Sequence, residues 1–248
     1  MRRINTHVYE AAAEAGVKSP DLAVFLQAQY GQCAEDLIVV SMLRAWQQRT
    51  GFDPASLRYL EIGANHPIGT SATYLLHQVL GMCGVLVEAN PSLIADLRRV
   101  RPADVVIHAA VQAQDVDTVL LSLAYASEIS SLDPAFVAGW GDGIVDARQT
   151  VEVPATRIAR VIETHLHGAS PAFLSIDVEG LDMEVLLDLD LRHYRPVLLQ
   201  IEPSDQLHPG RSEQMRTHMA SFGYRLAAVT DVNLIFVDGD TMGDAPRP

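Results

Sequence analysis

The chain changes character at the stretch Leu57-Arg58-Tyr59-Leu60-Glu61-Ile62-Gly63-Ala64-Asn65. Apolar and aromatic residues dominate its first six positions, as in a buried strand, and the glycine that follows is typical of a tight turn. After the turn, Thr70 or Ser71 can cap a helix that runs to about Leu80. The stretch therefore predicts a strand, a loop and a helix in succession.

The alternation of strand and helix continues along the chain. Further strands are predicted at residues 84–88, 105–111, 172–177 and 196–202. Helices are predicted at residues 91–99, 156–165, 181–189 and 211–222. Short extended pieces are expected at residues 119–123 and 150–153, and a closing hairpin at 224–229 and 233–237. Continuous apolar strands that alternate with helices predict an α/β fold, with a mostly parallel sheet and an antiparallel C-terminal hairpin.

The first 55 residues have a helical pattern instead. An apolar residue recurs at every third position of one segment, at Leu37, Val40, Leu43 and Trp46. These side chains fall on one helix face. We expect residues 1–55 to form an N-terminal helical cap within a single domain, whose main body is residues 56–240. The polar tail 241–248 is expected to be flexible.

The composition is that of a globular protein with a sizeable core. Of the 248 residues, 48% are hydrophobic and 20% are charged, and the net charge is −13. So acidic a chain is a poor binder of nucleic acid and of anionic membranes. Cys33 and Cys83 are too far apart for a disulfide framework or a metal-ligand pattern. With no signal core and no run of ~20 apolar residues, we expect a cytoplasmic protein without stable membrane insertion.

Ligands bind such a sheet at the carboxyl ends of its strands. These ends carry carboxylates, small residues and almost no cation. A nicotinamide cofactor needs Gly-x-Gly-x-x-Gly around its pyrophosphate, and Asn65 and Pro67 interrupt that pattern. S-adenosylmethionine has no phosphate and carries a sulfonium, so it fits better a loop with one required glycine, Gly63. Glu88, 25 residues later at the end of the second strand, is placed to hold the ribose hydroxyls.

Four segments of the sequence resemble the motifs of the FkbM-type methyltransferases, in the order of that family. They are Gln32-Cys33-Ala34-Glu35-Asp36-Leu37, Glu61-Ile62-Gly63-Ala64-Asn65, Gly84-Val85-Leu86-Val87-Glu88-Ala89-Asn90-Pro91 and Ser175-Ile176-Asp177-Val178-Glu179-Gly180. Ala34 and Pro67 stand where glycine is usual or common. The resemblance implies a Rossmann-like class I methyltransferase fold. It also implies methyl transfer from S-adenosylmethionine to a hydroxyl oxygen, mostly of sugars or secondary metabolites.

The residues expected to bind the cofactor lie mainly in these segments. They are Gln32, Glu35, Asp36, Glu61, Gly63, Ala64, Asn65, Glu88, Ala109, Ala110, Ser130 and Asp177. Some have a structural alternative. Glu35 and Asp36 could cap a helix instead, and Ser130 could belong to a capped turn. The two alanines could be close-packed core.

Asp177 is expected to orient and deprotonate the acceptor hydroxyl, because the strand that it ends borders the transferred methyl group in this fold. His66 is the competing base, and its ordinary pKa suits the task better. The side chains expected to contact the acceptor are Glu179, Glu202, Asp205 and His208. Trp140 could stack on a sugar ring or belong to the core.

Asp177, Glu179 and Glu202 also form an oxygen-rich group of the kind that binds Mg²⁺ or Ca²⁺. The alternative gives them separate roles as base, helix cap and backbone partner, and we expect no metal requirement. Two other function classes stay open: an NAD(P)-dependent oxidoreductase, which the interrupted glycine pattern disfavours, and a non-catalytic S-adenosylmethionine-binding module. The expected partner is a small-molecule or glycan acceptor, and a homo-oligomer remains open.

Overall fold

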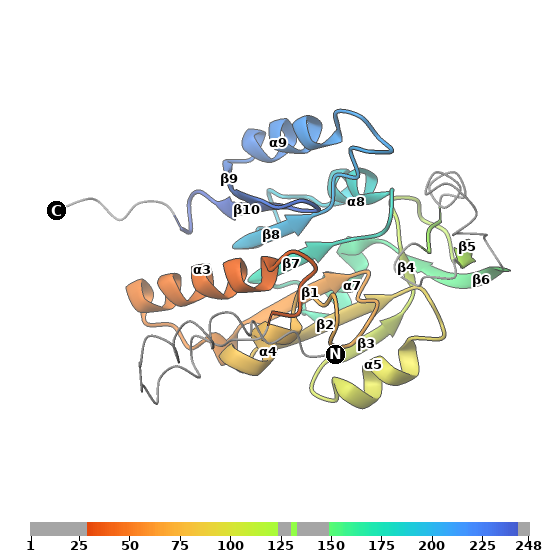
Figure 1. Ribbon diagram of the computed structural model, residues 1–248, viewed down its shortest axis with the longest axis horizontal. Helices are drawn as coiled ribbons and strands as arrows, with labels where there is room; N and C mark the ends of the chain where they lie inside the picture. Colours follow the sequence, from red (N-terminus) through yellow and green to blue (C-terminus); the bar gives the residue numbers. More distant parts are fainter. Residues whose placement is uncertain (1–28, 124–129, 133–148, 243–248) are drawn as a thin grey trace, which may run out of the picture.

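The computed structural model describes residues 29–123, 130–132 and 149–242 (Figure 1). Residues 1–28 of the expected cap, Trp140 and all but the first two residues of the expected tail lie outside the described residues. No helix in these ranges is both long and apolar enough to span a membrane.

The central sheet of the described chain has seven strands, in the order β3-β2-β1-β7-β8-β10-β9. They are β1 (Arg58–Ile62), β2 (Cys83–Glu88), β3 (Val105–His108), β7 (Phe173–Ile176), β8 (Leu198–Ile201), β9 (Tyr224–Val229) and β10 (Leu234–Asp238). The first five in this order are parallel, and β10 is antiparallel to both of its neighbours. The predicted mostly parallel sheet with an antiparallel C-terminal hairpin is confirmed. Strand order reverses between β1 and β7, where a ligand crevice is expected.

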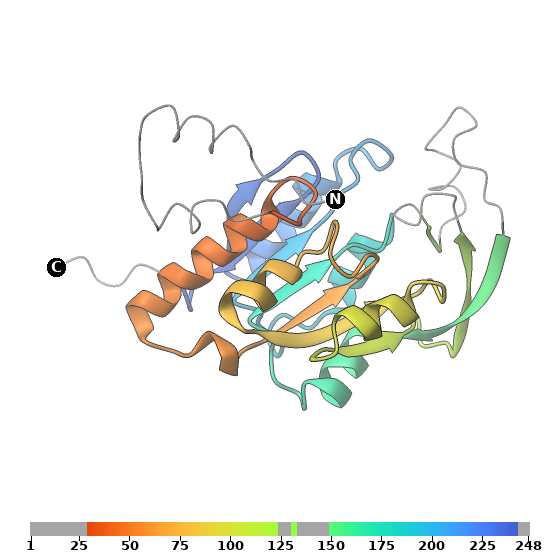
Figure 2. The same ribbon diagram turned by 60° about the horizontal axis from the view of Figure 1, so that its bottom comes forward.

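Helices cover both faces of this sheet, as Figures 1 and 2 show. One face packs against α3 (Glu35–Thr50), α4 (Tyr74–Leu80) and α5 (Ile94–Val100). The other packs against α7 (Ile158–His165), α8 (Asp182–Asp188) and α9 (Arg211–Ser221). Successive strand residues serve opposite faces, as a pleated strand requires: Tyr59 belongs to the α3 side, and Leu60 to the α7 side.

A second sheet departs from the sequence prediction. Residues 105–111 were expected to form one strand, but β3 ends at His108, and β4 (Ala110–Val111) joins a separate three-stranded sheet. In this sheet β4 pairs parallel with β6 (Gln149–Thr156), and β6 pairs antiparallel with β5 (Thr118–Leu123). The expected extended pieces therefore find their partners in each other, beyond the end of the main sheet (Figure 2).

The buried guanidinium of Arg101, 1% exposed, is a feature that the sequence did not predict. It donates to the carboxylate of Asp104 at 2.8 Å and to the hydroxyls of Tyr59 and Thr73 at 2.8 and 2.9 Å. A further bond reaches the carbonyl oxygen of Pro67 at 3.2 Å. Arg101 therefore ties the loop after β1 to β1 itself and to the end of α5.

The backbone at the start of α3 explains why the motif around Ala34 favours glycine at that position. Ala34, directly before the helix, has φ 67° and ψ 24°, in the left-handed region that favours glycine. Glycine is usual at this position in the family that the segment resembles. The alanine therefore keeps the turn of the motif and bears a conformational cost.

We predict that Ala34→Gly stabilises the protein, by up to about 1 kcal/mol, because it removes the strain of a left-handed alanine. Ala45→Gly is the matched control: Ala45 is exposed within α3, where glycine costs about 1 kcal/mol. Urea denaturation of both variants gives the two free energies of unfolding. Equal destabilisation by both substitutions would contradict the prediction.

Candidate active site

A cavity of about 550 Å³ opens at the carboxyl ends of the parallel strands. It runs from the end of β2 and the small sheet, past the ends of β1 and β7, to the 203–207 loop, α9 and the 229–234 turn. The predicted site residues that line it are Gln32, Gly63, Asn65, Glu88, Ala109, Ala110, Ser130, Asp177, Glu179, Glu202 and Asp205. One cavity therefore joins the expected cofactor, catalytic and acceptor residues.

Glu88 ends β2 at one end of the cavity. Its Oε2 accepts a hydrogen bond from the backbone N–H of Asn65 at 2.7 Å, and its Oε1 accepts one from Asn90 at 2.7 Å. Burial raises the pKa of this carboxyl group. Ala109 and Ala110 line the wall nearby, so this end combines one carboxylate with small apolar side chains.

Gly63 lines the cavity and is also required by the packing of the chain. A Cβ atom there would lie 1.7 Å from the carbonyl oxygen of Asp177. Its φ of 80° is also unfavourable for other residues. The glycine therefore allows the loop after β1 to lie directly against the end of β7.

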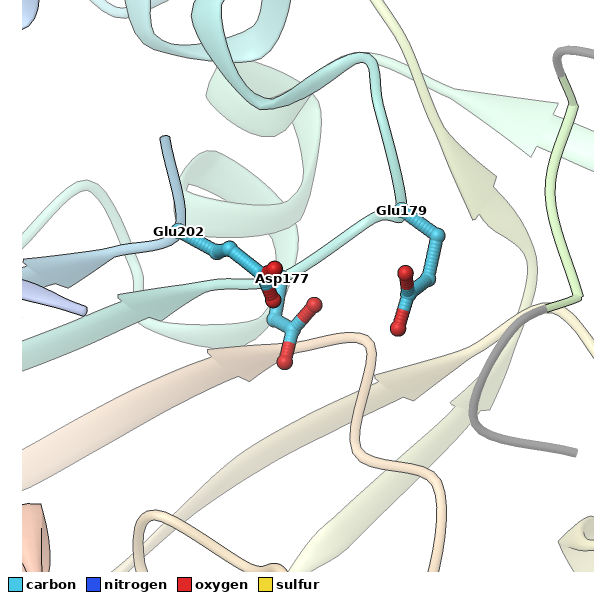
Figure 3. A group of neighbouring side chains, drawn as sticks. All are labelled: Asp177, Glu179 and Glu202. Atoms are coloured by element: carbon cyan, nitrogen blue, oxygen red, sulfur yellow. The ribbon is translucent and has the colours of Figure 1, made fainter. Parts of the chain in front are cut away.

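Three carboxylates meet where β7 and β8 end (Figure 3). Asp177, Glu179 and Glu202 each have a carboxylate oxygen within 4.8 Å of the others. Oδ1 of Asp177 is buried and has no hydrogen-bond partner within the described residues. Burial, with the nearby carboxylate of Glu202, raises the pKa of Asp177 well above its ordinary value. The cluster can thus relieve its repulsion by taking up a proton.

Glu179 is held by its backbone. Its φ is 55°, and its carbonyl oxygen accepts a hydrogen bond from the hydroxyl of Ser131 at 2.5 Å. Ser131 and Ser122 also exchange backbone hydrogen bonds, at 3.0 and 3.2 Å. The serine segment therefore connects the small sheet to the loop after β7, and its neighbour Ser130 lines the cavity.

The structure places Glu35 and Asp36 behind the cavity wall. Asp36 accepts hydrogen bonds from the N–H groups of Tyr30 and Leu37, at 2.6 and 3.0 Å. Glu35 accepts from the N–H of Cys33 at 2.8 Å and from the hydroxyl of Thr230 at 2.7 Å. Both carboxylates thus hold the turn before α3, and Glu35 also ties that turn to Thr230. This role is structural, although neither side chain is the N-cap of α3.

Glu61 and Ala64 also lie outside the lining of this cavity. The Glu61 carboxylate accepts the N–H of Ala72 at 2.8 Å and the hydroxyls of Ser71 and Thr73. Ala64 is buried, and its N–H donates to the carbonyl of Val87 at 3.0 Å. These two residues fix the loop that carries Gly63 and Asn65.

The two histidines are not brought to the carboxylates. His66 is exposed, and its Nδ1 accepts from the N–H groups of Ile68 and Gly69 at 3.1 and 2.8 Å. His208 is half-buried and does not line the cavity. Asp205 does line it, and its carboxylate caps α9 by accepting the N–H of Ser212 at 3.0 Å and the hydroxyl of that serine.

Three polar residues at the site escaped the sequence reasoning. Gln200 and Asn233 are each 6% exposed, and each keeps a buried amide oxygen without a partner in the described chain. Both line a second cavity of about 20 Å³, which Asp177 also borders. Arg216, on α9, lines the main cavity. The sequence offered one sign that Gln200 belongs to the site: it is a polar residue inside the otherwise apolar predicted strand 196–202.

The methyltransferase FkbM domain model matches residues 61–226. The O-methyltransferase from Bacillus cereus, solved with SAH, is 13% identical with a TM-score of 0.43, over 93% of this chain and 88% of that one. The TehB-like SAM-dependent methyltransferase from Corynebacterium glutamicum is 9% identical with a TM-score of 0.41, over 94% and 96%. MtNAS, solved with MTA and tNA, is 14% identical with a TM-score of 0.39, and this chain covers 60% of its length.

No curated protein matches this chain. The structural similarities are too low to carry an argument, so the assignment rests on the family model, which covers about two thirds of the sequence. The match begins at Glu61 in β1 and ends within β9, and thus contains most of the cavity wall. The chain belongs to the FkbM methyltransferase domain family, and is an S-adenosylmethionine-dependent methyltransferase rather than an NAD(P)-dependent oxidoreductase.

Proposed function

We propose that this enzyme methylates a hydroxyl oxygen of a sugar or secondary metabolite, as a free small molecule or within a glycan, in the cytoplasm. The observation that carries the proposal is that one cavity has two chemically different ends, with Asp177 between them. One end is small and apolar around Glu88. The other is built from the polar 203–207 loop and α9.

The first end suits the cofactor. Small side chains at Ala109 and Ala110 leave a slot for an adenine ring, and Glu88 can accept hydrogen bonds from ribose hydroxyls. Gly63, Asn65 and Gln32 line the way from there towards Asp177. When bound, S-adenosylmethionine supplies an electrophilic methyl group on a cationic sulfur. The acidic cavity wall suits that positive charge.

The other end suits a hydroxyl-rich acceptor. Glu179, Glu202 and Asp205 line it and can accept hydrogen bonds from sugar hydroxyls. His208 does not line this cavity, so we do not include it among the acceptor contacts. Asp205, which was also expected to contact the acceptor, remains. The 203–207 loop and the 229–234 turn both line the cavity and are the segments that we expect to select the acceptor.

Asp177 is placed to take the proton of the acceptor hydroxyl. A hydroxyl is about as weakly acidic as water, so it attacks poorly without help. Alignment of the reacting groups supplies most of the acceleration, about 7–11 kcal/mol, and a positioned base adds about 10²–10⁴-fold. The raised pKa of Asp177 makes its carboxylate a stronger base than an ordinary aspartate.

We predict that Glu88→Gln weakens adenosylhomocysteine binding by about 10-fold to 100-fold, because a charged acceptor on the ribose is replaced by a neutral one. Isothermal titration calorimetry measures the affinity, and thermal unfolding confirms that the variant is folded. Glu213→Gln, at an exposed position of α9, is the matched control and should leave the affinity unchanged. Unchanged binding in Glu88→Gln would mean that the ribose does not bind at Glu88.

We predict that Asp177→Asn loses at least ~100-fold in kcat while it keeps adenosylhomocysteine binding, because the amide cannot accept the proton. Transfer of a labelled methyl group to glycan and metabolite extracts of the source organism measures turnover, with a product heavier by one methylene.

The wild-type rate should also fall as the pH drops through the raised pKa of Asp177, since only the ionised carboxylate accepts a proton. This acid limb should be absent in Asp177→Asn. His66→Ala is the comparison and should stay near wild type, because His66 lies outside the cavity. Normal turnover in Asp177→Asn beside an inactive His66→Ala would assign the base to His66.

We predict that a chelator leaves the rate of methyl transfer unchanged. The three clustered carboxylates can relieve their repulsion by binding a proton, and the proposed proton transfer to Asp177 needs no metal. Activity with EDTA is compared with activity in added magnesium, at the same ionic strength. A rate that vanishes with EDTA and returns with magnesium would instead make Asp177, Glu179 and Glu202 metal ligands.

A further inference from the structure

Arg216 is the one basic side chain among the described residues that line the cavity. It lies four residues after Ser212 on α9, so both side chains point to the same side of the helix, and both line the cavity. The acidic side chains of the same wall are Glu88, Asp177, Glu179, Glu202, Asp205 and Asp231. A single cation thus faces an otherwise acidic cavity.

The guanidinium is not neutralised by that wall. Its Nε is buried and donates no hydrogen bond within residues 29–123, 130–132 and 149–242, and no carboxylate of these residues forms an ion pair with it. Arg211 on the same helix is different, because both of its terminal nitrogens reach Glu184, at 3.0 and 3.1 Å. Arg216 as a whole is half-buried, but a buried N–H group without a partner is costly, which points to a partner supplied from outside the chain.

Asp205 is the acidic side chain of the wall that bonds to α9. Its carboxylate accepts hydrogen bonds from the N–H and the hydroxyl of Ser212, and none from Arg216. Arg216 is left available to a ligand, and a planar guanidinium is suited to bidentate binding of an oxyanion.

Arg216 lies at the acceptor end of the cavity. Glu88 ends β2, and β8 is three strand spacings further along the sheet, or about 14 Å. α9 lies on the far side of β8, packed against β9 at the edge of the sheet (Figure 1). The guanidinium is therefore remote from the end that suits the adenosine part of the cofactor.

We propose that Arg216 binds an oxyanion group, a phosphate or a carboxylate, carried by the methyl acceptor; this inference rests on the proposed function. The acidic wall by itself repels an anionic acceptor, and a neutral one needs no cation. Arg216 thus selects acidic acceptors, such as a sugar phosphate or a uronic acid, over neutral ones.

The test titrates inorganic phosphate and, separately, acetate into protein saturated with adenosylhomocysteine, at constant ionic strength in chloride. The proteins are wild type, Arg216→Gln, Arg216→Lys and the control Arg98→Gln, in which an exposed arginine of α5 is neutralised. We expect at least one anion to bind wild type and Arg98→Gln equally. Binding to Arg216→Gln should be at least ~10-fold weaker, and Arg216→Lys should recover part of the loss. The anion that binds distinguishes a phosphate from a carboxylate acceptor.

Equal affinity of wild type and Arg216→Gln for both anions would overturn the proposal. So would a loss of adenosylhomocysteine affinity in Arg216→Gln with unchanged thermal unfolding, because Arg216 would then serve the carboxylate of the cofactor. Failure of the proposed function has a different signature: wild type itself would not bind adenosylhomocysteine. In that case the same anion titrations on the ligand-free proteins still decide whether Arg216 is an oxyanion site.

Discussion

The Arg101 guanidinium organises the region on which the cavity depends. It is buried with the carboxylate of Asp104 and with hydroxyl groups of β1 and of the loop after it. That loop carries Gly63 and Asn65 into the cavity, and the buried Glu61 holds its far end. A charge removed from water in this way is tolerated only with nearly complete hydrogen bonding. The loop is therefore held by groups that lie outside the lining of the main cavity.

The carboxylates of this acidic protein have different structural roles. Those behind the wall, Glu35, Asp36 and Glu61, accept backbone N–H and hydroxyl groups and shape the loops. Those at the wall of the main cavity are less uniform: Glu88 accepts two backbone N–H groups, whereas Asp177 has a buried oxygen with no partner in the described chain. Asp177 is therefore the carboxylate of the wall with the clearest capacity to bind a further group.

The sequence predicted the order of the strands and helices well, because continuous apolar runs separated by glycine and helix caps are compatible with few other arrangements of secondary structure. It also located Asp177, Glu88 and Glu202, since residues that end parallel strands must meet at one edge of the sheet. It could not decide which acidic residues cap turns, because a carboxylate before a helix suits both roles. Residues 105–111 were mistaken for one strand, because one polar residue, His108, in an otherwise apolar run does not reveal that the chain passes to another sheet.

The contact between Gly63 and Asp177 has an evolutionary consequence. It packs the loop after β1 directly against the end of β7, and both line the half of the cavity proposed for the cofactor. The half proposed for the acceptor is lined largely by the 203–207 loop, α9 and the turn between β9 and β10, all in the last fifth of the chain. On the proposed assignment, sequence changes confined to that terminal block would alter the accepted molecule and leave the cofactor half unchanged.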